Sequence, residues 1–532
     1  MHIISVFQYL LIILFFVANM GFYAQVQRMN LRNQDRDVHV FQQGTHRVVV
    51  DHNNSRIRHY ETNDVQQGFS NSRQFRVNGN VSPLLVVAPS GMRDIKILPA
   101  EIQVPLPENL QQAQMEQMNP ASQDPTVLFD LKKLALSCSF DKKNHDYKIN
   151  ENIIFTFSIT SKEKNLPNIS LFLEWKRTGD DAKIGEGRNE ISVSRPFSIS
   201  TSLDRPGFIH LEGTLKDASG KILSKFNGGV GVALEDIHES AKEPSDFDEY
   251  WKNQLIELDD IPLFAQVTKV SKENAAVDVY AVIIPCTGPH PATGYLSIPA
   301  KAKTNSLPAE LHLQAYGMRI PTIPQNPPDD KIYFDLNAHG LNLGESKQYY
   351  DNFSRSIGHY AYDIKQNQNR DTTYFKYMVH RVVQTCRYIK TIPQWNQHDF
   401  CVWGYSQGGL QTLWAAALVP GITLAKAGMP WSCNLGGAPL SGRLIGTAPQ
   451  YTDALNYYDP VFFAKRIPES CMVDFLRTGL GDYVSPPSSV TAVYNNVKGP
   501  KKITYYQGIG HEEPKIDSKA YTIDATQKTI QK

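Results

Sequence analysis

The spacing of apolar residues changes along the chain, and the change predicts two kinds of domain. From about Leu128 to Ile237, apolar and polar residues alternate in short runs, the clearest of which are Ile153–Ile159, Ser170–Trp175 and Gly207–Glu212. Alternation with a period of two, with Gly, Pro, Asn and Asp between the runs, is typical of strands that bury one face. We therefore predict a β-sandwich of immunoglobulin type over residues 128–237.

In the C-terminal part, compact apolar runs alternate with helical patterns. Asp399–Trp403 is short, apolar and aromatic, which predicts a strand buried on both faces of a parallel sheet. Leu410–Leu418 is rich in Leu and Ala and predicts a helix. Further strands are predicted at Cys471–Thr478 and Lys502–Tyr506. This alternation predicts an α/β domain over residues 238–532.

The first residues of the chain have the pattern of an export signal. Residues 3–18 are almost entirely apolar and are followed by Gly21–Gln25, which predicts cleavage after Ala24. An uncleaved anchor is the alternative, although the apolar stretch is short for a bilayer span. We expect an exported protein, periplasmic or extracellular, with no membrane partner once residues 1–24 are removed.

Residues 25–109 are rich in polar residues but contain the strand-like runs Val38–Phe41 and Arg47–Val50. They predict a further β-rich region, whose role the sequence does not indicate. Residues 110–127 are rich in Gln, Met and Pro and predict a linker.

Composition narrows the classes of function. The 532 residues exceed what a single core usually serves, which predicts several domains. The formal net charge is +1, and acidic and basic residues are interspersed, so nucleic acid is not expected as a partner. The six cysteines show no C-x-x-C spacing, so no zinc site is predicted, and their positions specify no disulfide pairing.

The candidate chemistry centres on Gly404–Gly408, a G-x-S-x-G between the predicted strand and the predicted helix. In this setting Ser406 lies on a sharp strand-to-helix turn, where the neighbouring backbone leaves no room for side chains at the glycines. The hydroxyl would also lie near the positive end of the following helix. The alternative is a serine that only caps the helix after a glycine turn.

A nucleophilic serine needs a base and a carboxylate that orients the base. Asp482 follows the strand predicted at Cys471–Thr478, and His511 follows the strand predicted at Lys502–Tyr506. The order serine, acid, histidine is the one expected when each residue follows a later strand. Asp474 is the rival acid but lies within an apolar run. Four other histidines precede or flank the serine strand: His312, His339, His359 and His398.

Several separated segments resemble carbohydrate esterase family 7, the acetyl xylan esterases and cephalosporin-C deacetylases. They cover about half of the chain, in the family's order: Pro244–Trp251, Gly404–Gly409, Gly479–Asp482 with Pro486–Ser488, Tyr494–Asn495 and Gly510–Glu512. The resemblance implies an α/β-hydrolase domain and deacetylation of xylan-type or related acetyl esters. No metal or organic cofactor is implied.

The same resemblance implies a role for each matching residue. Ser406 would be the nucleophile, His511 the general base and then acid, and Asp482 the orienting carboxylate. The backbone amides of Gln407 and Tyr316 would form the oxyanion hole.

Two segments depart from the family pattern. Gln314–Ala315 replaces His-Gly of its H-G-Y-G segment, and Asp335–Asn342 lacks the arginine and glutamine of its R-G-Q-G segment. The backbone amides do not depend on these side chains, so the departures concern substrate specificity and subunit assembly. The family also implies an oligomer with active sites facing a shared interior, which the N-terminal extension could block.

Three functions follow as expectations. The first is an esterase that deacetylates acetylated oligosaccharides. The others are another α/β-hydrolase, either a peptidase or a broader acyl esterase, and a catalytically idle glycan-binding protein, because the fold and the triad do not fix the leaving group.

Overall fold

The computed structural model describes only part of the chain: residues 29–30, 38–43, 46–51, 56–61, 131–142, 146–161, 170–516 and 518–526. The chain divides into two compact units, residues 1–126 and 127–532. The predicted export signal and the whole of the predicted linker lie outside the described residues.

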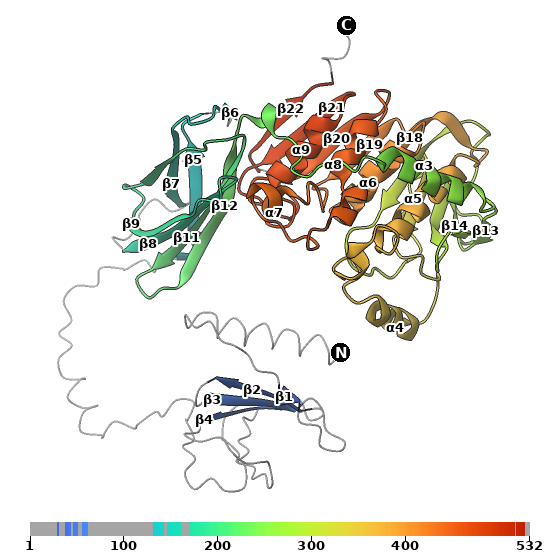
Figure 1. Cartoon of the computed structure of the whole chain (residues 1–532). Helices are drawn as coiled ribbons and strands as arrows, with labels where there is room; N and C mark the ends of the chain where they lie inside the picture. Colours follow the sequence, from blue (N-terminus) through green and yellow to red (C-terminus); the bar gives the residue numbers. More distant parts are fainter. Residues whose placement is uncertain are drawn as a thin grey trace, which may run out of the picture. The chain divides into compact units, whose positions relative to one another are not determined.

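In the first unit the described residues form one antiparallel sheet with the order β1-β2-β3-β4 (Figure 1). Its strands are β1 (Met29–Asn30), β2 (Val38–Gln43), β3 (His46–Asp51) and β4 (Arg56–Glu61). The strand-like runs predicted in this region lie within β2 and β3.

The second unit begins with two facing sheets, drawn in teal and green in Figure 1. One has the strand order β10-β7-β5 and the other β6-β12-β11-β8-β9. Their strands are β5 (Leu134–Phe140), β6 (Asp146–Tyr147), β7 (Ile153–Ser161), β8 (Leu171–Gly179), β9 (Gly185–Ile191), β10 (Phe197–Thr201), β11 (Gly207–Asp217) and β12 (Ile222–Val232). Alternate residues such as Phe155, Phe157 and Leu211 fill one shared core. We call these two sheets the sandwich; its immunoglobulin type stays a prediction.

Trp175 on β8 is half-buried and packs against the core of the sandwich. Its indole N–H donates to Asn189 Oδ1 at 2.9 Å, so its polar edge is occupied.

The rest of the second unit is built on a sheet that contains ten strands among the described residues. They are β13 (Gln266–Lys269), β14 (Val277–Ile284), β15 (Ala292–Pro299), β16 (Leu307–Leu313), β17 (Ile332–Asn337), β18 (Trp395–Tyr405), β19 (Leu424–Gly428), β20 (Met472–Gly479), β21 (Lys501–Tyr506) and β22 (Ala520–Asp524). The order is β13-β14-β15-β17-β16-β18-β19-β20-β21-β22, and the strands from β17 to β21 are parallel. The antiparallel β15 and the exchanged order of β16 and β17 are those of an α/β-hydrolase sheet.

The helices are α3 (Phe247–Asp259), α4 (Lys347–Ile357), α5 (Phe375–Ile389), α6 (Gln407–Leu418), α7 (Gly437–Ser441), α8 (Pro460–Phe463) and α9 (Pro487–Asn496). Short 3₁₀ turns are η1 (Leu131–Lys133), η2 (Leu234–Asp236), η3 (Gln366–Gln368), η4 (Asp453–Tyr457) and η5 (Ala464–Arg466). Within the described ranges, none of the helices is both long and apolar enough to cross a bilayer.

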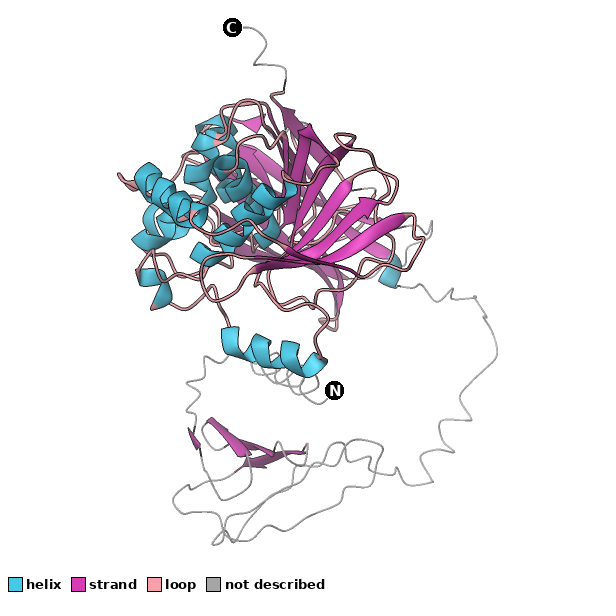
Figure 2. Cartoon of the chain, turned by 90° about the vertical axis from the view of Figure 1, so that its right-hand side faces the viewer, coloured by secondary structure: helices cyan, strands magenta, loops and turns pink. Residues whose placement is uncertain are grey.

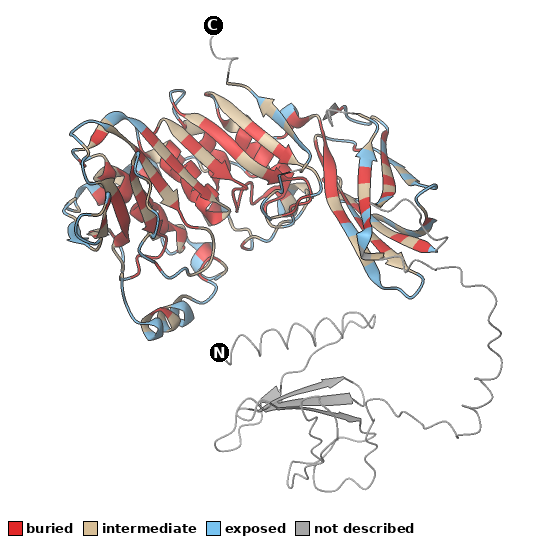
Figure 3. Cartoon of the chain, turned by 180° about the vertical axis from the view of Figure 1, so that it is seen from behind, coloured by how far each residue is buried: buried red, intermediate tan, exposed pale blue. Residues whose placement is uncertain are grey.

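Most of the helices gather on one face of the large sheet, and α4 lies apart from it (Figure 1 and Figure 2). Phe400 and Val402 of β18 point to that face and are buried, whereas Cys401 and Trp403 are half-buried on the other. Figure 3 shows, from behind, that buried and partly buried residues alternate along strands of the large sheet. The prediction that this strand is buried on both faces was therefore wrong. Only one face of the described sheet carries helices, and on the other Trp403 donates to Glu310 Oε1 at 2.8 Å.

The sandwich packs directly on the α/β part. Phe208 of β11 belongs to the core of the α/β part and lies 5.8 Å from the ring of Tyr505 on β21. Asp180, buried at the end of β8, accepts hydrogen bonds from Leu444 N at 2.7 Å and Ser488 Oγ at 3.2 Å. These contacts favour a packing role over a free spacer.

Candidate active site

Ser406 occupies the turn between β18 and α6. Its backbone has φ 56° and ψ −118°, outside the regions that residues with a Cβ ordinarily adopt. The turn is held on both sides, because Ser406 N donates to Gly428 O at 2.9 Å and Ser406 O accepts from Trp431 N at 3.0 Å. A strained serine at a strand-to-helix turn is the conformation expected of a nucleophile elbow.

Two glycines make this turn sterically possible. A Cβ at Gly404 or at Gly408 would collide with the carbonyl oxygen of Leu313, at the end of the neighbouring β16. The structure thus gives the physical reason for glycine on either side of Ser406, as the sequence predicts.

Three side chains predicted from their order in the sequence meet at this turn. His511, after β21, has its Nε2 2.9 Å from Ser406 Oγ and its Nδ1 2.8 Å from Asp482 Oδ2. Because the carboxylate only accepts, Nδ1 carries the proton and Nε2 is left to accept from the serine hydroxyl. This is the geometry of a nucleophile, a base and an orienting acid.

Asp482 is fixed by its own loop. Its side chain is fully buried, and Oδ1 accepts the backbone N–H groups of Val484 and Ser485, each at 2.8 Å. The second oxygen is thereby directed at His511, so the carboxylate has one orientation.

The rival acid and the four other histidines make contacts outside this hydrogen-bond chain or are exposed. Asp474 pairs with Lys502 Nζ at 3.0 Å, whereas His511 pairs with Asp482. His312 bonds to Asp335 at 2.8 Å, and His339 bonds to Tyr374 at 2.9 Å. His359 and His398 are exposed.

The two amides predicted for an oxyanion hole are on neighbouring loops. Within the described part of the chain, neither Gln407 N nor Tyr316 N donates to a protein acceptor. Tyr360 joins the loops, because its hydroxyl accepts from Gly317 N at 3.2 Å and donates to Gln407 Oε1 at 2.5 Å. Tyr360 is not predicted from the sequence, because it lies 43 residues from Gly317 and 47 residues from Gln407 in the chain.

The two segments that depart from the family pattern are held in place by hydrogen bonds. Gln314 O accepts from Gln411 Nε2 at 3.0 Å, which ties the loop after β16 to α6. Asn337 Oδ1 accepts from His339 N and Leu341 N at 3.0 and 3.1 Å. The segment that lacks R-G-Q-G is therefore held by other side chains.

Ser406 and His511 open into a cavity of about 510 Å³, which we call the catalytic pocket. Its lining is Ala315, Tyr316, Arg319, Tyr362, Tyr405, Ser406, Met429, Trp431, Thr447, Arg477, Val484 and His511. Burial raises the pKa of Tyr316, and raises that of Tyr362 to about 12, so these phenols are neutral. The permanent charges of the lining are then two arginines.

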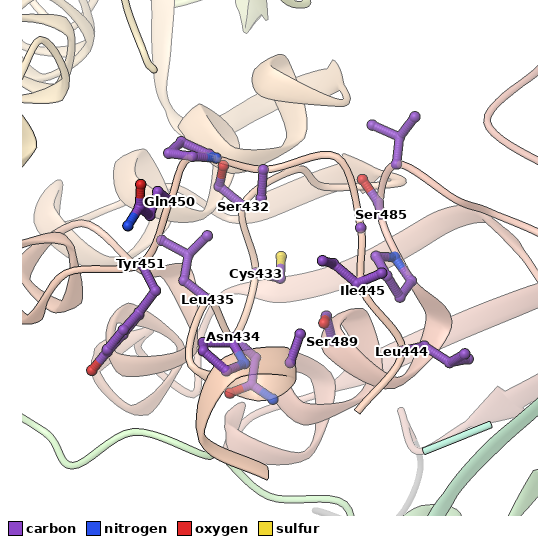
Figure 4. Close-up of a pocket in the computed structure, with 17 residues that line it drawn as sticks. Ser432, Cys433, Asn434, Leu435, Leu444, Ile445, Gln450, Tyr451, Ser485 and Ser489 are labelled. Carbon is purple, nitrogen blue, oxygen red and sulfur yellow. The ribbon is translucent and has the colours of Figure 1, made fainter. Parts of the chain in front are cut away.

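A second cavity of about 460 Å³ adjoins the first (Figure 4). Val484 lines both, and Thr447 lines the catalytic pocket while its neighbours Gly446 and Ala448 line the second. In the part of the chain that the structure describes, no charged side chain lines this second cavity, so the arginines distinguish the catalytic pocket from its neighbour.

The sandwich reaches the loops that carry the acid and the base. Asn227 Nδ2, on β12, donates to Gly481 O at 2.7 Å. Gln507 bonds twice to Gly229 of β12, accepting from its N–H at 2.9 Å and donating to its carbonyl at 2.8 Å. Sequence reasoning missed these residues, because a contact between positions more than 250 residues apart leaves no local pattern.

Comparisons with known proteins agree on one family. A family model described as acetyl xylan esterase matches residues 231–438 and 446–525, more than half of the chain. The match includes Ser406, Asp482 and His511. The acetyl esterase Axe7A of Xylanibacter ruminicola is 28% identical over 331 residues, which are 59% of this chain and 73% of that protein.

Solved structures similar to this chain include two acetyl xylan esterases. The acetyl xylan esterase from Paenibacillus sp. R4 is 20% identical, with 53% of this chain and 94% of that chain covered and a TM-score of 0.44. Acetyl xylan esterase 1 from Thermoanaerobacterium sp. JW/SL YS485 is also 20% identical, with 53% and 93% covered and a TM-score of 0.41.

Proposed function

The chain belongs to the acetyl xylan esterase family and is a carboxylic ester hydrolase, and from that premise we propose that it removes acetyl groups from xylan-type oligosaccharides. The proposal takes Ser406 as the nucleophile, His511 as the base and Asp482 as the orienting carboxylate. The observation that carries it is the continuous hydrogen-bond chain from Ser406 Oγ through the imidazole to the buried carboxylate.

In the first half of the reaction, Ser406 Oγ attacks the acetyl carbonyl carbon while His511 Nε2 takes the serine proton. The negative charge that develops on the carbonyl oxygen would be stabilised by the amides of Gln407 and Tyr316, which have no protein acceptor among the described residues. His511 then gives the proton to the sugar oxygen, the carbon–oxygen bond breaks, and the sugar alcohol leaves.

In the second half, His511 removes a proton from water, and the water oxygen attacks the acetyl group on Ser406. The ester bond to Ser406 breaks, the proton returns to the serine oxygen, and acetate leaves. Asp482 stabilises the imidazolium in both halves without taking its proton.

Acetate release from acetylated xylo-oligosaccharides and from p-nitrophenyl acetate tests this function. We expect the purified protein to hydrolyse both and to leave a peptide p-nitroanilide intact, since the family match is to an esterase. Cleavage of the anilide at a comparable rate would instead favour a peptidase. Failure to turn over any of the three would leave a glycan-binding protein as the better description.

A further inference from the structure

Two guanidinium groups line the catalytic pocket beside Ser406. Arg319 lies on the loop that follows β16, three residues after Tyr316, and Arg477 lies on β20. Among the described residues, no aspartate or glutamate belongs to the lining. A solvent-open pocket whose permanent charges are both positive favours an anionic ligand.

Arg477 is held in place at the edge of the pocket. Its guanidinium carbon lies 4.0 Å from the ring centre of Tyr405, the residue before Ser406. Its backbone φ of 58° is in the left-handed region, where an arginine is uncommon. Stacking on a fixed ring leaves the edge of the guanidinium, with its N–H groups, available for a planar partner.

The contacts that these arginines make within the protein occupy few of their N–H groups. The ion pair of Arg477 is with Glu513 Oε1 at 2.7 Å, and the Glu513 side chain is 72% exposed. Exposed ion pairs of this kind contribute little and exchange readily with solvent or ligand. In the part of the chain that the structure describes, the exposed side chain of Arg319 forms no ion pair.

We propose that Arg319 and Arg477 bind a carboxylate carried by the sugar part of the substrate. The proposal rests on the esterase function above. The acetyl group is small and uncharged, so an anionic group at this site belongs to the leaving alcohol. Among oligosaccharides this is a uronic acid residue close to the acetylated sugar. Guanidinium and carboxylate pair through two parallel hydrogen bonds, which gives orientation as well as affinity.

Competition between acidic and neutral substrates tests this inference. We expect acetylated xylo-oligosaccharides that carry a uronic acid to have a kcat/KM about tenfold above that of neutral ones, as one charge-assisted hydrogen bond can provide. Added NaCl should reduce the preference. The double variant Arg319→Gln/Arg477→Gln should lose this preference, so that its kcat/KM for acidic substrates falls to that for neutral ones, and its turnover of p-nitrophenyl acetate reports whether the triad is still assembled. Arg355→Gln, on the distant α4, is the matched control.

The outcomes separate the two proposals. Equal turnover of acidic and neutral oligosaccharides by the wild type would overturn the carboxylate site and leave the esterase function standing. No turnover of p-nitrophenyl acetate or of either oligosaccharide would overturn the esterase function itself. Acetate is also a carboxylate, so inhibition by added sodium acetate that the double variant relieves, without any substrate preference, would assign the arginines to the product instead.

A separate set of contacts concerns the sandwich. Asn227 Nδ2 donates to the carbonyl of Gly481, the residue before Asp482. Asn227 Oδ1 forms a hydrogen bond with His210 Nε2. Gly481 N in turn donates to Ile509 O at 2.9 Å, which ties the acid loop to the loop of His511. A Cβ at Gly481 would collide with the Asn227 side chain, so the two are in close contact.

We infer that Asn227 is a positioning residue for the triad. Asn227→Ala should lower kcat for p-nitrophenyl acetate roughly tenfold with KM nearly unchanged, because a small displacement of Asp482 misdirects His511. Asn189→Ala is the matched control, since it also removes a side-chain hydrogen bond of the sandwich but one that reaches only Trp175. Equal kcat losses in both variants, or no loss in Asn227→Ala, would contradict the inference.

Discussion

Ser406→Ala is expected to lower kcat for p-nitrophenyl acetate by a factor of about 10⁴ to 10⁶, the loss seen when a member of such a triad is removed. Without the hydroxyl there is no acceptor for the acetyl group, and His511 has no proton to take. The remaining turnover would come from water bound near the amides of Gln407 and Tyr316. Steady-state hydrolysis with the folded state checked by circular dichroism measures the effect.

Ser432→Ala is the matched control for this substitution. Ser432 has the same φ of 56° and follows Trp431 of the catalytic pocket, but Ser432 itself lines the second cavity. Its variant should keep kcat within about twofold, because its hydroxyl contacts no reacting atom. An Ser406→Ala protein that retains wild-type turnover would place the nucleophile elsewhere.

The parts of the site that the sequence predicts are those with a local physical cause. Gly404 and Gly408 are required because the backbone of Leu313 leaves no room for a Cβ at either position. This requirement is visible in the sequence as the five-residue motif Gly404–Gly408. Asp482 and His511 follow the strands β20 and β21, and the carboxyl ends of parallel strands meet at one edge of a sheet. Chain order therefore brings them to Ser406 without any knowledge of side-chain contacts.

What the sequence does not predict depends on contacts between distant segments. Whether a strand is covered on one face or both depends on which helices pack against it. The apolar run of β18 therefore predicts burial on both faces, whereas the structure buries only one face fully. Tyr360, Arg477 and Asn227 acquire their positions only when the loops around Ser406 are assembled. The sequence around each of these three residues has no feature that distinguishes it from an ordinary surface position.

Asp482→Asn is expected to lower kcat by about 10⁴-fold while leaving the fold intact, because the change reverses the tautomer of His511. The backbone N–H groups of Val484 and Ser485 both donate to Oδ1. In the variant they would hold the amide oxygen there and turn the amide NH₂ toward His511 Nδ1. That nitrogen must then accept, the proton moves to Nε2, and Nε2 can no longer take the proton of Ser406.

Asp474→Asn provides the matched comparison, on the strand β20 that precedes Asp482. Asp474 is a buried acid that pairs with Lys502 at 3.0 Å, away from the imidazole. Its variant should cost some stability, since one partner of a part-buried ion pair is lost, but kcat should stay within about threefold. A large kcat loss in Asp474→Asn together with normal turnover in Asp482→Asn would exchange the two assignments. The melting temperatures of both variants separate that outcome from simple unfolding.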